Sequence, residues 1–388
     1  MKCFMKENIM TKIEDPQIRE RLRINSAISG KPLIGPKSVN IHVTSACSYK
    51  CEFCWYFSPL VKDQPKAKRL EYPVLEGVLE DCHSMSVDEI NFEGGETTVY
   101  PFWKEAFKKV DDLGMRLIAY THLDYHADAA ALRALCYAQK LTVNFSAVTE
   151  ASFKQVHGKQ ASMTRVLKNL DRLLSLRDKF GKPHFALSFV VYNYNYHELA
   201  GFLDMAHQRK VDQVIVRFLK PTEETKSLFF SKEQLEELRG IVDRALQKTY
   251  SYTHDLARLQ QTLSQGKVFE NALSLTHSPE HNDRLLLYDS TGGHTHCHMG
   301  WFYSHIDEKG RVVAPCDNVG VCVAGNVNER RFKDIWFDND FLHATLKEAS
   351  KGIQTSTGKW QECRYCSYVQ VNKTLHEKIL KIEGQKNP

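Results

Sequence analysis

Apolar and polar residues follow two alternating patterns over the first half of the chain. Short segments in which every second residue is apolar, such as Ser38–Val43, are typical of strands, and each leads into a segment with the 3.6-residue period of an amphipathic helix. Strands that alternate with helices predict βαβ units and one parallel sheet. The six predicted strands are Ser38–Val43, Glu89–Phe92, Arg116–Tyr120, Leu141–Ser146, Phe185–Tyr192 and Val214–Phe218, and the helices between them are Tyr72–Met85, Phe102–Leu113, Ala127–Ala138, Ser162–Lys179 and His197–Gln208.

Outside this series the pattern changes. A short helix is predicted over Gln17–Ala27, and residues 231–266 have the pattern of a charged amphipathic helix. A β-hairpin is predicted around the turn Glu308-Lys309-Gly310, followed by a helix over Phe341–Ala349. The predicted organisation is an N-terminal extension (1–36), a parallel α/β domain (37–222), a helical connector (223–296) and a small cysteine-rich domain (297–388).

Three cysteines follow the first predicted strand with C-x3-C-x2-C spacing. Cys47, Cys51 and Cys54 can bind three irons of a cubane cluster and leave the fourth iron without a protein ligand. A structural zinc site or a disulfide is the alternative, although a closed tetrahedral zinc site needs a fourth ligand. An iron without a protein ligand is open to a small molecule.

The second predicted strand ends in Gly94-Gly95-Glu96. Two glycines let backbone groups approach a ligand closely, and the carboxylate beside them can accept hydrogen bonds from an ammonium group. A tight turn with a surface glutamate is the alternative. In parallel α/β folds function collects at the C-terminal ends of the strands, so we expect this loop and the cysteine loop to converge.

A second group of cysteines lies late in the chain. Cys297, Cys316, Cys363 and Cys366 supply four thiolates, enough to close a second [4Fe–4S] cluster, and a four-cysteine zinc site is the alternative. Cys322 lies between them and is left over from this set.

Composition limits the class of protein. The chain has 388 residues, 11 cysteines and a formal net charge of +5 without a basic block, which gives nucleic-acid binding little support. No segment has the apolar length of a signal peptide or a membrane span, so we expect a cytoplasmic protein without a membrane partner. Cysteines in a reducing compartment favour metal binding or catalysis over disulfides.

The cysteine spacing, with the aromatic Phe53 just before the last cysteine, resembles the signature of the radical S-adenosylmethionine (SAM) superfamily. The resemblance implies an α/β fold with a partial, TIM-like (β/α)6 barrel, in which Gly94, Gly95 and Glu96 hold the amino group of SAM. It also makes polar residues near strand ends candidates for SAM contacts: Asn144, Ser146, Asn193 (or Asn195 beside it) and Arg217. The family often has proline after this motif and an arginine–glycine pair after the fourth strand, whereas this chain has Thr97-Thr98 and His157-Gly158.

The late cysteines and the segments around them resemble the Twitch form of the SPASM auxiliary-cluster domain, a β-hairpin plus a helix. The implied cofactors are two [4Fe–4S] clusters and SAM, and the implied partner is an electron donor such as flavodoxin or ferredoxin. The expected chemistry is reductive cleavage of SAM to a 5′-deoxyadenosyl radical that abstracts a substrate hydrogen.

The substrate is open at this stage. We expect oxidation or epimerisation of a small polar metabolite in a biosynthetic pathway. A maturase of ribosomally synthesised peptides is one alternative, and an iron–sulfur electron carrier or redox sensor is another. For Cys322 three roles compete: a buried structural thiol, a substitute cluster ligand, or a catalytic hydrogen donor to the substrate radical.

Overall fold

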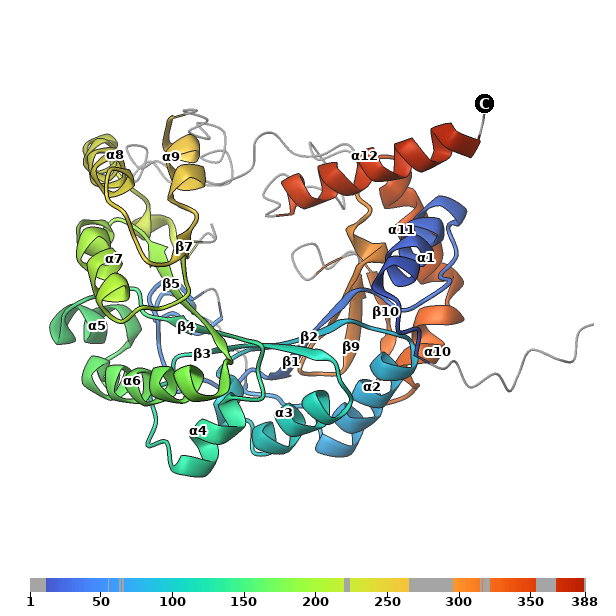
Figure 1. Ribbon diagram of the computed structural model, residues 1–388, viewed down its shortest axis with the longest axis horizontal. Helices are drawn as coiled ribbons and strands as arrows, with labels where there is room; N and C mark the ends of the chain where they lie inside the picture. Colours follow the sequence, from blue (N-terminus) through green and yellow to red (C-terminus); the bar gives the residue numbers. More distant parts are fainter. Residues whose placement is uncertain are drawn as a thin grey trace, which may run out of the picture. The chain divides into compact units, whose positions relative to one another are not determined.

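The computed structural model describes residues 12–54, 56–62, 64, 66–219, 224–264, 296–314, 316, 322–353 and 368–386. Contacts divide the chain between two units. The first unit takes its residues from 1–46, 68–118 and 290–388, and the second from 47–67 and 119–289. These units cut across the four predicted segments, whose boundaries stay a prediction. In each unit helices lie alongside parallel strands (Figure 1).

Strand β1 (Ser38–Thr44) lies inside the sheet of the first unit, where the strand order is β10-β9-β8-β1-β2. Strands β2 (Glu89–Gly94) and β8 (Tyr303–Ile306) run parallel to it on its two sides. Strand β9 (Arg311–Ala314) pairs antiparallel with β8, which confirms the predicted hairpin, and β10 (Cys322–Asn326) pairs antiparallel with β9. The cysteine-rich segment therefore continues the sheet that β1 and β2 begin.

Helices cover one side of these strands. Every second residue of β1 (Val39, Ile41 and Val43) is apolar and at most 1% exposed, and Figure 1 shows α2 and α3 running along β1 and β2. Helix α1 begins where the Asp15 carboxylate accepts a hydrogen bond from the Gln17 N–H, the usual way to satisfy a free helical donor. The helices of this unit are α1 (Pro16–Ser29), α2 (Tyr72–Ser84), α3 (Trp103–Asp112), α10 (Phe332–Phe337), α11 (Asp340–Lys351) and α12 (Val369–Lys386).

The second unit contains a parallel sheet in the order β4-β5-β6-β7. Its strands are β4 (Lys140–Asn144), β5 (His184–Val191), β6 (Gln213–Phe218) and β7 (Thr253–His254), and β3 (Arg116–Thr121) runs from the first unit into the second. Its helices are α4 (Ala129–Leu135), α5 (Glu150–His157), α6 (Met163–Phe180), α7 (Leu199–Gln208), α8 (Lys232–Leu246) and α9 (Leu256–Ser264). All six strands predicted from the first half of the sequence are present.

The prediction of one long helix over residues 231–266 is wrong. The segment forms α8 and α9 with strand β7 between them. The interruption contains Tyr250 and Tyr252, aromatic residues that favour strands, and the Asp255 carboxylate accepts a hydrogen bond from the Val216 N–H of β6. Helix α5 was also missing from the prediction.

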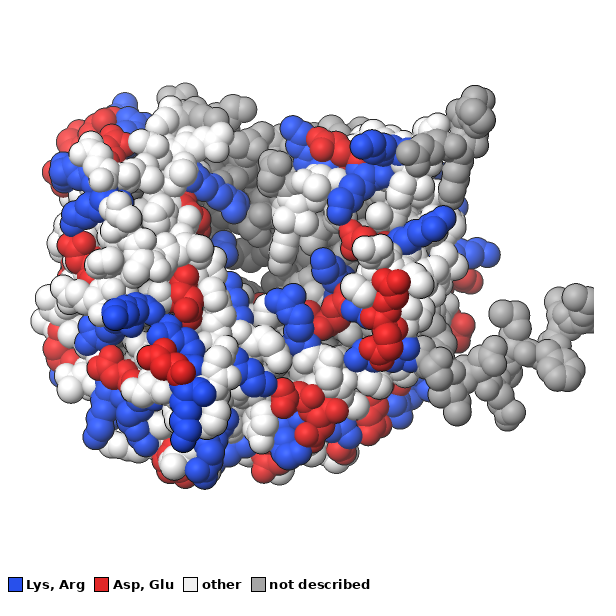
Figure 2. All heavy atoms as spheres, in the orientation of Figure 1, with Lys and Arg blue, Asp and Glu red and all other residues white. Residues whose placement is uncertain are grey.

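Two general features concern the surface. Among the described residues, no helix combines the length and the apolar character that crossing a membrane requires. Basic and acidic side chains are interspersed over the face shown in Figure 2, in line with the small net charge.

One ion pair with a buried carboxylate joins distant parts of the first unit. The Asp81 carboxylate in α2 is 2% exposed and accepts two hydrogen bonds from Arg331, which precedes α10, at 2.7 and 3.0 Å. The two residues are 250 positions apart in the sequence. The pair therefore links the cysteine-rich segment to a helix of the parallel fold.

Replacing Arg331 with methionine should destabilise the protein, because the Asp81 carboxylate would stay buried without its cation. The expected loss is about 1–3 kcal/mol, measured as a lower urea midpoint. The control is Lys108→Ala, which breaks the exposed Lys108–Asp112 pair and should cost under about 1 kcal/mol. Equal midpoint shifts for both variants would contradict this account.

Candidate active site

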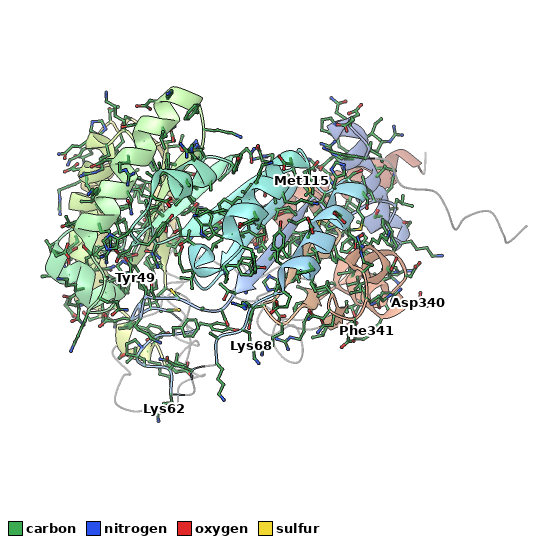
Figure 3. All side chains as sticks on the ribbon, turned by 90° about the horizontal axis from the view of Figure 1, so that it is seen from below. Tyr49, Lys62, Lys68, Met115, Asp340 and Phe341 are labelled. Carbon is green, nitrogen blue, oxygen red and sulfur yellow. The ribbon has the colours of Figure 1, made fainter. Side chains whose placement is uncertain are left out.

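The cysteine loop, residues 47–54, lies in the second unit and has no helix or strand of its own. Its backbone is fixed on the last turn of α5, where Lys50 N–H donates to the His157 carbonyl and Glu52 N–H to the Val156 carbonyl, both at 3.0 Å. Figure 3 labels Tyr49 in this loop and Lys62 beyond the end of the loop, where its side chain points outward. Helix α5, absent from the sequence prediction, is thus the support of the loop.

Side chains between the first two cysteines anchor the loop a second time. The Tyr49 hydroxyl donates to the Asp124 carboxylate at 2.8 Å, and Arg165 forms an ion pair with the same carboxylate. The Asp124 N–H donates to His122 Nδ1 at 2.9 Å, so His122 carries its proton on Nε2 and donates it to the Ser48 hydroxyl at 2.8 Å. The loop is therefore held by backbone bonds on one side and by this network on the other.

Each cysteine sulfur of the loop lies near an N–H group or a ring nitrogen. The Tyr49 N–H donates to Cys47 Sγ at 3.4 Å and the Phe57 N–H to Cys54 Sγ at 3.3 Å. The third sulfur, Cys51 Sγ, lies 3.1 Å from His157 Nδ1. Hydrogen bonds to sulfur stabilise negative charge on iron-bound thiolates, so the surroundings fit a cluster.

Burial raises the pKa of the Cys51 thiol well above its usual value, and the neighbouring Cys54 and Cys47 sulfurs add to the shift. A buried thiol with such a pKa ionises only when a cation compensates it, as iron does. Among the described residues, no three His, Cys, Asp or Glu side chains converge on one point for a single ion. A cubane cluster does not need such convergence, because each cysteine binds a different iron.

The Gly-Gly-Glu loop lies in the first unit, at the end of β2. Gly94 has a φ of 115°, a conformation that favours glycine, and a Cβ on Gly95 would lie 2.1 Å from the Ala46 carbonyl oxygen. The Glu96 N–H donates to that same carbonyl at 2.8 Å. The glycines therefore let this loop run against Ala46, the residue that directly precedes Cys47.

Glu96 is 2% exposed and its carboxylate is fixed from its own loop. Oε1 accepts the Thr98 N–H at 3.1 Å and the Thr98 hydroxyl at 2.5 Å. The sequence Thr97-Thr98, where the family often has proline, therefore orients this carboxylate through Thr98.

The other predicted SAM contacts lie in the second unit. Asn144 accepts a hydrogen bond from the Ser146 hydroxyl at 2.7 Å, and this hydroxyl also accepts the Val190 N–H. Asn193 donates to the Ser227 carbonyl, and Arg217 is exposed on β6. Ser146 and Asn193 thus have structural partners, and roles of these residues and of Phe53 in SAM binding stay predictions.

The late cysteines are partly described. Cys297 and Cys316 are buried, and Cys322 is 1% exposed at the start of β10, opposite Ala314 of β9. Cys363 and Cys366 lie outside the described residues. None of the eight described cysteines forms a disulfide. The four-thiolate ligand set of the auxiliary cluster stays a prediction.

Parallel strands and a three-cysteine loop define an iron–sulfur protein of α/β fold. The model of the radical SAM superfamily matches residues 41–206, and the model of the SPASM iron–sulfur cluster-binding domain matches residues 297–367. The chain belongs to the radical SAM superfamily and carries a C-terminal SPASM-type domain. These matches imply [4Fe–4S] clusters and SAM as its cofactors.

Two curated relatives match part of the chain. An S-adenosylmethionine-dependent nucleotide dehydratase of Flammeovirga pacifica is 27% identical over 135 residues, which are 34% of this chain and 46% of that protein. A probable GTP 3′,8-cyclase of Saccharolobus islandicus is 21% identical over 216 residues, 55% of this chain and 66% of that protein. The chain thus spans less than two thirds of either relative.

Solved structures with the same fold cover more of the chain. Streptococcus suis SuiB bound to S-adenosylmethionine aligns with a TM-score of 0.59 at 15% identity, over 92% of this chain and 78% of that one. The protein anSMEcpe with bound AdoMet aligns with a TM-score of 0.53 at 13% identity, over 87% and 89%. They show the fold alone, and they confirm the predicted class, a partial TIM-like barrel with a small C-terminal domain.

Sequence reasoning missed the residues that support the site. His157, Tyr49 and His122 are close to the cysteine loop only in the folded chain, and scattered histidines give no local pattern. Thr98 was noted as a departure from the family, and its role became visible only with the Glu96 contact.

Replacing Glu96 with alanine should weaken SAM binding without loss of iron, if the carboxylate holds the amino group of SAM. A charge-assisted hydrogen bond of roughly 1.5–3 kcal/mol corresponds to an affinity loss of about tenfold or more. Equilibrium binding of SAM to the reconstituted protein measures it. The control is Glu89→Ala in β2, the strand that precedes the loop. If Glu96→Ala binds SAM as tightly as this control, the loop is a turn without a role in SAM binding.

The anaerobically reconstituted protein should bind about eight irons, in two [4Fe–4S] clusters. Replacing Cys47, Cys51 and Cys54 together with alanine should halve the iron and abolish SAM cleavage. Iron and zinc analysis of both proteins checks this. Zinc bound to the late cysteines, with only one iron cluster in the unmodified protein, would contradict the prediction of an auxiliary [4Fe–4S] cluster.

Proposed function

We propose that this radical SAM enzyme is an oxidoreductase that oxidises or epimerises a small polar metabolite. SAM bound at the three-cysteine cluster supplies a 5′-deoxyadenosyl radical, which takes a hydrogen atom from the substrate. The protein's own residues bind and orient the substrate, and a small one-electron donor such as flavodoxin or ferredoxin supplies the electron.

The observation that carries the proposal is a polar face on β1, β2 and β8. We call it the polar face and define it as Ser38, Asn40, His42, Asn91, Glu93 and His305. On β1 and β2 these residues alternate with apolar, buried ones such as Val39, Ile41 and Phe92. Asn91 Nδ2 donates to Ser38 Oγ and to Asn40 Oδ1, both at 2.7 Å, so the two asparagines are fixed in orientation.

Two histidines and a carboxylate continue the polar face. The rings of His42 and His305 meet edge to face with centroids 4.3 Å apart, and His42 Nε2 lies 4.0 Å from Glu93 Oε2. Burial lowers the pKa of His305 to about 4, so near neutral pH its ring offers one donor and one acceptor. A Cβ on Gly94 would lie 3.2 Å from the His42 Cβ, so the polar face reaches the Gly-Gly-Glu loop.

The hydrogen-bonding capacity of this face is not exhausted. Asn91 Oδ1 and His305 Nδ1 are buried and have no hydrogen-bond partner among the described residues. Buried polar atoms in proteins are nearly always paired, with protein, water or ligand. Fixed amides and a neutral imidazole beside the predicted SAM loop suit a substrate rich in hydroxyl or amide groups.

The relatives support a small polar substrate, and one neighbour supports the alternative. By their names the two curated relatives act on nucleotides, which are polar metabolites. SuiB has also been solved bound to the precursor peptide SuiA, and it aligns with a TM-score of 0.59 at 14% identity. This likeness concerns the fold and not the substrate, so a peptide maturase is the second candidate. The experiment below tests for it.

The test is SAM cleavage by the reduced, reconstituted protein with candidate substrates. We expect 5′-deoxyadenosine in every case, and a new product only with small polar metabolites such as nucleoside triphosphates or aminosugars. In Asn91→Leu, which cannot donate to Ser38 or Asn40, the ratio of 5′-deoxyadenosine to product should rise while iron content is unchanged. No SAM cleavage would favour an electron carrier, and product formed only with peptides would favour a maturase.

Cys322 distinguishes oxidation from epimerisation. A thiol has a weak S–H bond, so a cysteine that donates its hydrogen atom to the substrate radical leaves the substrate epimerised without net oxidation. The thiyl radical then returns to the thiol with one electron from the electron donor and one proton. Cys322→Ala is expected to keep activity, product and both clusters if the buried thiol of β10 is structural. The measurement is deuterium incorporation from D2O into product, together with the spectrum of the auxiliary cluster.

Two other results would change the assignment of Cys322. Loss of the auxiliary-cluster spectrum would make it a cluster ligand in place of one of the four named cysteines. Loss of solvent deuterium from the product, with both clusters intact, would make it the hydrogen donor and the enzyme an epimerase.

A further inference from the structure

We infer that His157 donates a hydrogen bond from Nδ1 to the sulfur of Cys51 when this cysteine is an iron ligand, and that this bond makes the reduction potential of the SAM-binding cluster less negative. His157 lies outside the predicted ligand and cofactor set, and this role of His157 is independent of the identity of the substrate.

The geometry places one ring nitrogen at the sulfur. His157 Nδ1 lies 3.1 Å from Cys51 Sγ, within hydrogen-bond range for sulfur, although the two residues are 106 positions apart in the sequence. The His157 carbonyl also accepts the Lys50 N–H at 3.0 Å. The same residue therefore holds the backbone on one side of Cys51 and the sulfur itself.

The ring cannot easily turn away from this position. His157 is fully buried, and its ring packs against Phe153 and Tyr49 with centroids 4.5 and 5.1 Å apart, and against Phe53 at 6.0 Å. These neighbours are aromatic rings, which offer the imidazole no strong competing hydrogen bond. The contact with Cys51 is thus the polar interaction that the packing preserves.

Iron binding decides which atom carries the proton. A protonated Cys51 thiol can donate to Nδ1, whereas an iron-bound thiolate has no proton and can only accept. Two acceptors 3.1 Å apart would repel each other, so with the cluster in place Nδ1 must carry the proton. The other ring nitrogen, Nε2, is buried without a hydrogen-bond partner among the described residues. No acceptor among these residues therefore favours the tautomer with the proton on Nε2.

The sign of the effect on the potential follows from charge. Reduction adds one electron to a cluster whose sulfurs carry much of the negative charge, and a donor N–H at a ligand sulfur stabilises this charge. Removing the donor should therefore make the potential more negative. At a fixed solution potential, a smaller fraction of the cluster would then be reduced and ready for SAM.

The experiment compares two variants of the full-length, reconstituted protein. His157→Phe keeps an aromatic ring and lacks a donor, whereas His157→Asn places its amide nitrogen where Nδ1 stands. Redox titration followed by electron paramagnetic resonance gives the midpoint potential, read on the signal that changes when SAM is added. We expect the ratio of reduced to oxidised cluster at a fixed potential to fall about tenfold in His157→Phe, or ~59 mV for one electron, and to recover in His157→Asn.

A control variant separates the hydrogen bond from loop distortion. His122→Phe removes another imidazole that holds the cysteine loop, in this case through the Ser48 hydroxyl. Its potential should stay at the wild-type value. An unchanged potential in His157→Phe, or an equal shift in His122→Phe, would overturn the inference.

A second measurement covers the case in which His157→Phe fails to hold the cluster. Wild-type protein labelled with ¹⁵N-histidine should show a ¹⁵N coupling to the reduced SAM-binding cluster in pulsed electron paramagnetic resonance. The coupling should be absent from His157→Asn labelled in the same way. No such coupling in the wild type would also overturn the inference.

Discussion

The predicted cluster site depends on how the fold holds residues 47–54, a segment that carries Cys47, Cys51 and Cys54 and has no secondary structure of its own. Three cysteines on a mobile loop could rearrange around a metal and recruit another ligand. Here Lys50 and Glu52 bond to the end of α5, and Tyr49 bonds to Asp124. These contacts hold the backbone between the cysteines and so set the positions of the three predicted cluster ligands.

The sulfurs of this loop are prepared for a cationic partner. Burial and the neighbouring sulfurs raise the pKa of Cys51, while backbone N–H groups point at Cys47 and Cys54. The raised pKa disfavours a thiolate at Cys51 when no metal is bound. The N–H groups favour negative charge on the Cys47 and Cys54 sulfurs when these bind iron. Together they make ionisation of the loop depend on iron, as is general for cysteine sites.

How much the sequence could predict depended on whether a feature is local. Strand and helix periods identified the parallel strands, and Gly310, with a φ of 81°, closes the hairpin turn predicted at Glu308-Lys309-Gly310. The pairing of β8 with β1 was not predictable, because it joins segments more than 250 residues apart without a local signal. The same holds for His157, which became part of the site only through a contact with Cys51. Glu96 was predicted from its glycines, yet what those glycines approach, the Ala46 carbonyl, was seen only in the folded chain.

The iron left open by the three cysteines is expected to bind the amino group of SAM. The most direct measurement is electron–nuclear double resonance on the reduced protein with SAM that carries ¹⁵N in its amino group. The account predicts a ¹⁵N coupling to the cluster that replaces the ¹⁴N coupling of unlabelled SAM. A cluster signal without nitrogen coupling from bound SAM would contradict it.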